Sequence, residues 1–329
     1  MILANEFLIE AFEPAYLRLQ AEGSLAPRAE AALAGLESCH VCPRCCGDNR
    51  LEGETGTCQT GRHALVSSAF PHLGEEDCLR GSRGSGTIFF GLCNLGCDFC
   101  QNWDISHQPS GRECDAGEIA SLMLDLQARG CHNINFVTPG HLAPQVVEAV
   151  AAAVPLGLNL PIVYNTSAYD SLSSLELLDG IVDIYMPDFK FWRPETGQRL
   201  ARARDYPDRA REAVLEMQRQ VGPLRLGPDG VASRGVLVRH LVMPGLGDET
   251  AAIFEWLARE VSPDTFVNVM GQYRPAHRVG EPDDRGQRRH LDLDRGPTRK
   301  EMDAAYTAAR QAGLWRFDNK RRRAIFLQA

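Results

Sequence analysis

The chain has 329 residues, of which 44% are hydrophobic and 24% are charged, as in an ordinary globular protein. No apolar run approaches the roughly 20 residues that cross a membrane. The first residues lack the basic stretch and apolar block of a secretory signal, so we expect a cytoplasmic protein. The net charge of −8 argues against a broad nucleic-acid surface. The basic run at 320–323 is expected to be a solvated terminal segment or, alternatively, a docking patch.

The first 82 residues are predicted to form an N-terminal extension. Residues 1–38 are rich in alanine and are predicted to be helical, whereas residues 39–82 are rich in cysteine and glycine and poor in periodic pattern. Ten of the eleven cysteines of the chain precede residue 115. Clustered cysteines in a reducing compartment indicate metal ligation rather than disulfides, so we expect a bound metal to hold residues 39–82 together.

From residue 83 onward, short apolar runs alternate with amphipathic segments. This alternation predicts βαβ units and a parallel sheet, with ligands bound at the carboxyl ends of the strands. Six such units are too few for an eight-stranded barrel. We therefore expect an α/β fold, a partial (β/α)6 TIM-like barrel over 83–315, followed by a C-terminal tail at 316–329. The predicted strands are 87–92, 133–138, 161–164, 181–186, 236–242 and 266–270, and the predicted helices are 115–129, 142–154, 207–221 and 250–260.

The strongest motif follows the first of these strands. Cys93, Cys97 and Cys100 form a C-x3-C-x2-C pattern on one short loop. Three thiolates can ligate three irons of a [4Fe–4S] cube and leave the fourth iron open to a bidentate molecule, such as S-adenosylmethionine. The simpler alternatives are a zinc knuckle and an ordinary ferredoxin-type cluster. Phe99 is a plausible ring to lie beside an adenine.

With this motif at the start of a βα series, the sequence resembles the radical S-adenosylmethionine (SAM) superfamily. Residues 39–315 look more closely like the glycyl-radical activating enzymes, and in particular like the pyruvate formate-lyase activating enzyme-like group. Asp188-Phe-Lys190 resembles the Asp-Leu-Lys of those enzymes, and the segment from Arg239 to Asp248 matches their Arg-x4-Pro-Gly-x2-Asp pattern. At 138–141 this chain has Thr-Pro-Gly-His and so departs from the family's Gly-Gly-Glu motif.

The resemblance implies SAM contacts at the ends of the later strands. An arginine inside an apolar strand needs a partner, and a carboxylate of SAM would satisfy Arg239. His240 points to the opposite face of the same strand and is expected to be structural. For several of the others a purely structural role is the alternative. The candidate SAM contacts are Phe99, Thr138, His141, Asn165, Ser167, Asp188, Lys190, Arg239, Gln272 and Tyr273.

A second group of cysteines precedes the predicted barrel. Similarity to the closest group of relatives implies a metal site formed by Cys39, Cys42, Cys46 and Cys58, with Cys45 as an extra thiol that could replace one of them. Four thiolates form a closed site, which fits zinc and an auxiliary iron–sulfur cluster equally well. Such a centre would relay electrons, anchor a substrate or only brace the fold. The remaining cysteines are expected to be small buried hydrophobic residues, namely Cys78, Cys114 and Cys131.

The resemblance implies that a reduced cluster cleaves SAM and that the resulting radical removes hydrogen from a substrate, with no side chain needed as a general base. The leading hypothesis is activation of a glycyl-radical enzyme, with flavodoxin or ferredoxin as the reductant. One alternative is radical modification of a different peptide or of a small molecule. A further alternative is an iron–sulfur electron carrier or scaffold without SAM chemistry. Neither a nucleic acid nor a membrane is expected as a partner.

Overall fold

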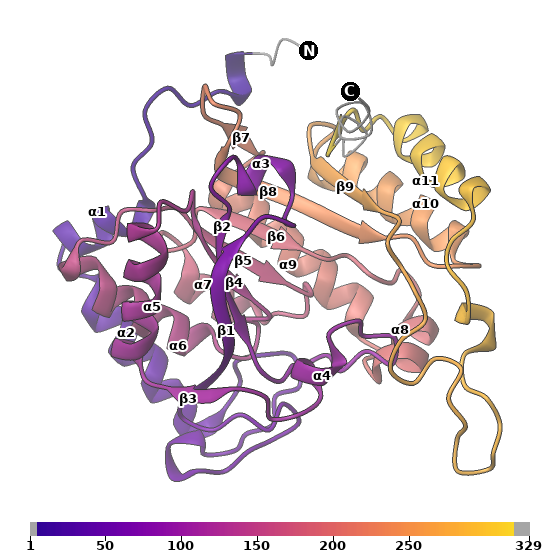
Figure 1. Cartoon of the computed structure of the whole chain (residues 1–329), viewed down its shortest axis with the longest axis horizontal. Helices are drawn as coiled ribbons and strands as arrows, with labels where there is room; N and C mark the ends of the chain where they lie inside the picture. Colours follow the sequence, from indigo (N-terminus) through magenta and orange to yellow (C-terminus); the bar gives the residue numbers. More distant parts are fainter. Residues whose placement is uncertain (1–4, 319–329) are drawn as a thin grey trace.

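The computed structural model describes residues 5–318, in which an open, mixed sheet is flanked by helices (Figure 1). The basic run at 320–323 lies outside the described residues. The core of the sheet consists of parallel strands that pair in the order β2 (Ser85–Phe90), β4 (Ile134–Val137), β5 (Ile162–Thr166), β6 (Ile184–Pro187), β8 (Ala232–Leu241) and β9 (Phe266–Met270). The α/β class and the parallel core strands are thus as the sequence predicts.

Helices connect these strands, and α2, α5 and α6 pack beside one another on one side of the sheet (Figure 1). No helix among the described residues is long and apolar enough to cross a membrane. The helices are α1 (Ala15–Ala21), α2 (Leu25–Ala34), α3 (Asp77–Arg80), α4 (Trp103–Ser106), α5 (Ala116–Ala128), α6 (Ala143–Ala153), α7 (Leu172–Leu178), α8 (Pro194–Ala201), α9 (Tyr206–Val221), α10 (Gly247–Trp256) and α11 (Arg299–Gln311).

Local sequence explains where α5 begins and which face it buries. The Asp115 side chain accepts the Glu118 backbone N–H at 2.8 Å, and the Glu118 carboxylate accepts the Asp115 N–H at 3.0 Å. This reciprocal capping box satisfies two backbone donors that the first helical turn leaves free. Ile119, Met123 and Leu126 then recur at helical spacing and are buried against the sheet side.

The sheet begins earlier than the sequence predicts. β1 (Ala64–His72) lies in the segment expected to be irregular, and it pairs antiparallel with β2. Its sequence, ALVSSAFPH, lacks the strict alternation that marks a half-buried strand, and its burial pattern is correspondingly mixed. Backbone pairing and the stacking of Phe70 on Phe89 therefore stabilise a strand that the hydrophobic pattern of its side chains does not predict. The remaining strands extend the sheet at its edges, as β3 (Arg112–Cys114) beside β1, β7 (Arg225–Leu226) beside β8 and β10 (Arg316–Phe317) beside β9.

After β1, the chain folds under the sheet and fills its concave side. Cys78 and Leu79 of α3 pack against buried residues of β5, β6 and β8. The Asn268 amide of β9 donates to Glu76 at 2.8 Å, and the Asn135 amide of β4 donates to Glu75 at 2.8 Å. One short segment thus contacts strands from both halves of the sheet, which requires the sheet to curl around it.

Candidate active site

A cavity of about 300 Å³ lies at the carboxyl ends of the core strands, where ligands of parallel α/β sheets bind. Cys93, Cys97 and Cys100 all line it, and they lie on the loop between β2 and α4 (Figure 1). Gly96 has φ +65°, a left-handed conformation that glycine adopts without strain, and it turns the loop between the first two cysteines. The three cysteines that are close in sequence therefore also line one cavity in the fold.

The surroundings of the three thiols suit an iron–sulfur cluster. The Leu95 N–H donates to the Cys93 sulfur at 3.4 Å, and Ser106 Oγ lies 3.1 Å from the Cys100 sulfur. Burial raises the pKa of Cys93 and of Cys97, while the Lys190 ammonium opposes this rise at Cys97. Buried thiols of this kind lose their protons when a metal binds.

A row of charged side chains forms the wall of the cavity beside these thiols. Asp188, just after β6, accepts from Lys190 Nζ and from Arg239 Nε, each at 2.6 Å. Arg239 also donates to Asn165 Oδ1 at 2.6 Å. Burial alone would raise the pKa of Asp188, but Arg239 and Lys190 outweigh it and hold that pKa below its usual value. The wall is thus a fixed array of paired charges inside the protein.

The structure places eight of the ten predicted SAM contacts in this cavity. They come from the ends of separate strands and from the cluster loop, and they are Phe99, Thr138, Asn165, Ser167, Asp188, Lys190, Arg239 and Gln272. Arg239 has carboxylate partners within the protein, whereas the sequence predicts a SAM carboxylate as its partner. Glu75 and Glu76 each lie 3.7 Å from its Nη1, in addition to Asp188 at its Nε.

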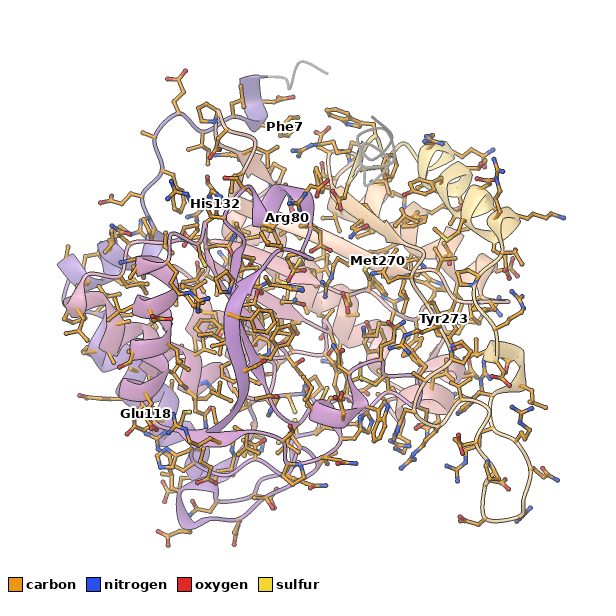
Figure 2. The ribbon with its side chains drawn as sticks, in the orientation of Figure 1. Phe7, Arg80, Glu118, His132, Met270 and Tyr273 are labelled. Atoms are coloured by element: carbon orange, nitrogen blue, oxygen red, sulfur yellow. The ribbon has the colours of Figure 1, made fainter. Side chains whose placement is uncertain are left out.

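The other two predicted contacts lie elsewhere. Tyr273 is buried beneath the cavity, where its hydroxyl donates to the Leu293 carbonyl at 2.9 Å and its ring lies 6.2 Å from that of Phe99. Figure 2 labels Tyr273 together with Met270, which ends β9 and does line the cavity. His141 lies in a different pocket, described below, and does not line the cavity.

His240 has the structural position that strand alternation predicts. Its Nδ1 donates to the Phe189 carbonyl at 2.8 Å, and its Nε2 accepts from the Thr250 hydroxyl at 2.9 Å. Burial lowers the pKa of His240 to about 4, so the ring is neutral at physiological pH and bridges β8 to α10.

Several polar residues that line the cavity are not predicted from the sequence, among them His72 and Glu75. His72 Nδ1 lies 3.6 Å from the Glu75 carboxylate. Burial raises the pKa of the neighbouring Glu76 to about 7, whereas His72, Glu76 and Arg239 outweigh burial at Glu75 and lower its pKa. The available signal was the run His-x2-Glu-Glu, whose adjacent acids are followed by the apolar pair Cys78-Leu79 after Asp77, but it lies outside the barrel expected over 83–315.

A second, smaller pocket collects the N-terminal cysteines. Cys39, Cys42, Cys45, Cys46 and Cys58 line it, together with Asp48, Arg50 and His141. The Cys45 thiol is exposed and donates to the Cys42 carbonyl at 3.6 Å. His141 is 1% exposed, and burial, aided by the Arg50 guanidinium, lowers its pKa to about 3. The four predicted ligands thus share one pocket, which also receives a residue of the main sheet region.

Comparison with known proteins identifies the family. The model of the radical SAM superfamily matches residues 87–257, which include the three-cysteine loop and most of the cavity wall. The chain belongs to the radical SAM superfamily. Membership implies a [4Fe–4S] cluster and SAM as cofactors, and the cavity described above presents the thiols and polar groups that would hold them.

A curated relative of this radical SAM protein is an uncharacterized protein, MJ0674, from Methanocaldococcus jannaschii. It is 32% identical over 286 residues, which cover 84% of this chain and 76% of the relative. The solved structures that resemble this chain share less sequence identity with it. SuiB from Streptococcus suis is 11% identical with a TM-score of 0.40, covering 58% of this chain and 42% of SuiB. The methyltransferase TsrM from Kitasatospora setae is 13% identical with a TM-score of 0.44, covering 70% and 52%. The chain thus spans less than half of SuiB and about half of TsrM.

In this radical SAM protein, the N-terminal segment is attached directly to the cluster loop. Arg44 donates to the backbone carbonyls of Asn94 and Leu95 at 3.0 and 3.1 Å, and to those of Ala201 and Arg202 at 3.0 and 2.7 Å. A single guanidinium from the cysteine-rich segment therefore connects the cluster loop to the end of α8.

Proposed function

We propose that this protein reductively cleaves SAM and uses the resulting radical to abstract hydrogen from a substrate held in the cavity, within a partial (β/α)6 barrel. The observation that carries the proposal is the shared cavity. Three thiols on one loop face it, and eight side chains predicted to contact SAM line the same space. When bound there, the cluster and SAM supply a 5′-deoxyadenosyl radical, which is the chemistry common to the superfamily.

The side chains of this protein hold the cofactor and shield it from water, and they do not take part in the reaction themselves. Lys190 and Arg239 present cationic groups whose positions are fixed by Asp188, so they are preorganised to meet an anionic group of the cofactor. Phe99 is 4% exposed, and its ring packs edge-on against Phe191 at 5.8 Å, which provides an apolar surface next to the last cysteine. These contacts orient the cofactor and exclude water.

The proposed substrate is a protein or peptide, and the specific reaction is activation of a glycyl-radical enzyme with flavodoxin or ferredoxin as the electron donor. The matches at Asp188-Phe-Lys190 and at Arg239 to Asp248 support it, because they belong to the glycyl-radical activating enzymes. The altered sequence at 138–141 and the second cysteine group are differences from those enzymes.

A small-molecule substrate is the second candidate, and a specific observation favours it. Glu75 and His72 enter the cavity from the segment that fills the concave side of the sheet. A carboxylate and an imidazole in the cavity lining suit hydrogen bonding to a compact polar substrate.

The test is anaerobic incubation of reconstituted, reduced protein with SAM. We expect 5′-deoxyadenosine and methionine, loss of both products in Cys97→Ala, and their retention in Cys131→Ala, a buried cysteine away from the cavity. Absence of 5′-deoxyadenosine from the parent protein would support an electron carrier or scaffold. A glycyl signal in electron paramagnetic resonance (EPR) of a partner protein separates glycyl-radical activation from other substrates.

A further inference from the structure

The loop between β4 and α6 directs His141 away from the SAM cavity and into the pocket of the N-terminal cysteines. The imidazole is 1% exposed, and apart from a weak contact with the Gly91 backbone neither ring nitrogen has a hydrogen-bond partner among the described residues. An unpaired buried polar group costs on the order of 1–3 kcal/mol. A buried imidazole with an unpaired ring nitrogen beside five cysteines indicates that a bound metal supplies the missing partner.

Arg50 places His141 next to the inner cysteines. This arginine is 1% exposed, and its Nη1 donates to the His141 carbonyl at 2.9 Å while lying 3.9 Å from the Cys39 sulfur. Its Nε is fixed by the Gly61 carbonyl at 3.0 Å. One buried cation thus ties the histidine backbone to the first thiol of the segment.

The five thiols are not equivalent. Cys39 and Cys42 are 8% and 7% exposed, and both Cys39 and Cys58 act electrostatically on the Cys42 thiol. Cys45 and Cys46 are exposed. Cys45 already donates to a carbonyl, and the Cys46 sulfur accepts the Thr57 N–H at 3.4 Å on the outer side of the pocket. Three inner thiols remain, one fewer than a closed metal centre requires.

We propose that His141 is the fourth ligand of the second metal centre, in a set of three sulfurs and one nitrogen with Cys39, Cys42 and Cys58. The Gly91 backbone approaches the imidazole as a weak hydrogen-bond acceptor, the kind of outer contact that orients most metal-binding histidines. In this set His141 takes the ligand position that similarity to relatives gives to Cys46. The proposal depends on a metal centre being present at the N-terminal cysteines, and it does not depend on SAM cleavage.

Zinc and an iron–sulfur cluster share this ligand chemistry. The iron, sulfide and zinc content per chain distinguishes the two.

The assignment links the two sites through one short loop. Thr138 lines the SAM cavity and has φ +61°, a strained conformation for a β-branched residue. Three residues later, His141 lines the second pocket. Metal bound to the imidazole would hold the loop, so the second centre would fix part of the SAM cavity wall.

The experiment uses the full chain with Cys93, Cys97 and Cys100 all replaced by alanine, so that bound metal reports only the second centre. Iron, sulfide and zinc are measured per chain after separate loading with iron plus sulfide and with zinc. Pulsed EPR of the reduced iron form, with ¹⁵N-histidine labelling, detects a nitrogen ligand, and X-ray absorption does so for zinc. We expect one histidine nitrogen at the metal.

Variants in that background identify the nitrogen. His141→Ala should lose the nitrogen signal and bind metal at least about tenfold more weakly, the lower end for loss of even an outer-sphere partner. His141→Cys should keep the metal with sulfur ligands only, which shows that the fold survives the substitution. Cys46→Ser and the control Cys45→Ser should keep both metal and nitrogen signal. An all-sulfur centre, no bound metal, or loss of metal in Cys46→Ser with retention in His141→Ala would overturn the proposal. SAM cleavage is assayed separately on the parent chain, so failure of the proposed function would be recognised on its own.

Discussion

Arg44 donates its Nε–H to the backbone carbonyl of Asn94 at 3.0 Å, which joins the cysteine-rich segment to the loop that carries the radical motif. The Asn94 amide in turn donates to the Tyr169 carbonyl at 2.8 Å. Asn94 also hydrogen-bonds the Cys42 thiol and thereby opposes the rise that burial causes in its pKa. The residue after the first motif cysteine therefore contacts both cysteine groups.

Replacing Arg44 with glutamine should loosen the cluster loop without removing any thiol. We expect unfolding free energy to fall by about 1–3 kcal/mol, because charge-assisted bonds to backbone carbonyls are lost. We also expect a lower iron content after reconstitution and a smaller change in the EPR spectrum when SAM is added. Arg259→Gln, on a side chain that is 76% exposed, is the matched control and should leave all three measurements unchanged.

Replacing Arg239 with methionine should lower the free energy of unfolding, because it leaves buried carboxylates without their cationic partner. Asp188, Glu75 and Glu76 would lose their common partner. We expect a loss of about 3–5 kcal/mol at pH 7.5, the usual result of removing one side of a buried ion pair. The loss should shrink at pH 5, because protonation neutralises carboxylates that the arginine no longer stabilises. Urea unfolding at both pH values checks this, and an equal loss at each would contradict it.

Asp170 should make the protein less stable as pH rises toward neutrality. Burial raises its pKa from 3.8 to about 6, although the Thr166 and Tyr164 hydroxyls donate to it. Between these two values the folded protein holds a proton that the unfolded chain has released, so unfolding free energy falls with increasing pH. The Asp170 contribution should be complete by about pH 7.

Asp170→Asn removes this titration while keeping a group that the two hydroxyls can bond. We expect the variant to lose roughly 2 kcal/mol less than the parent between pH 4 and pH 7. Chemical unfolding across that range measures the difference. Identical pH profiles for the two proteins would refute the assignment.

Gly235 should tolerate no side chain. An added Cβ would lie 2.4 Å from the Pro223 carbonyl oxygen and 2.4 Å from the Leu224 Cα, and φ is +123°. Gly235→Ala should therefore destabilise the protein by about 2 kcal/mol or more. Gly245→Ala is the comparison, because φ is +74° but nothing lies within 4 Å of the added Cβ. It should cost only about 1 kcal/mol. Thermal unfolding of both variants separates steric from conformational cost.

The sequence predicts the part of the fold whose signals are local. Apolar runs bounded by turns give the core strands, and periodicity gives α5, α6 and α9 to within two residues. The three-cysteine motif can be recognised from the sequence because its spacing along the chain is also a local signal. The polar wall of Asp188, Lys190 and Arg239 follows from charged residues in otherwise apolar strands.

What the sequence does not predict depends on contacts between distant segments. β1 is defined by pairing with β2, and Glu75 enters the cavity only because α3 fills the concave side of the sheet. The place of His141 after β4 predicts a SAM contact, but packing sets the direction of a side chain in a turn. Arg50, 91 residues away, holds the backbone there. No local pattern reports such a contact.

The antiparallel strand β1 also bears on how this protein can be handled. Shortening the gene to the region that matches the superfamily would give a chain that begins after β1 and α3. The edge of β2 would then present unpaired N–H and C=O groups, and these form a template for intermolecular strand addition. The shortened product should precipitate or form fibrils rather than yield a minimal catalyst, which makes the strand and the segment before it a built-in solubility element.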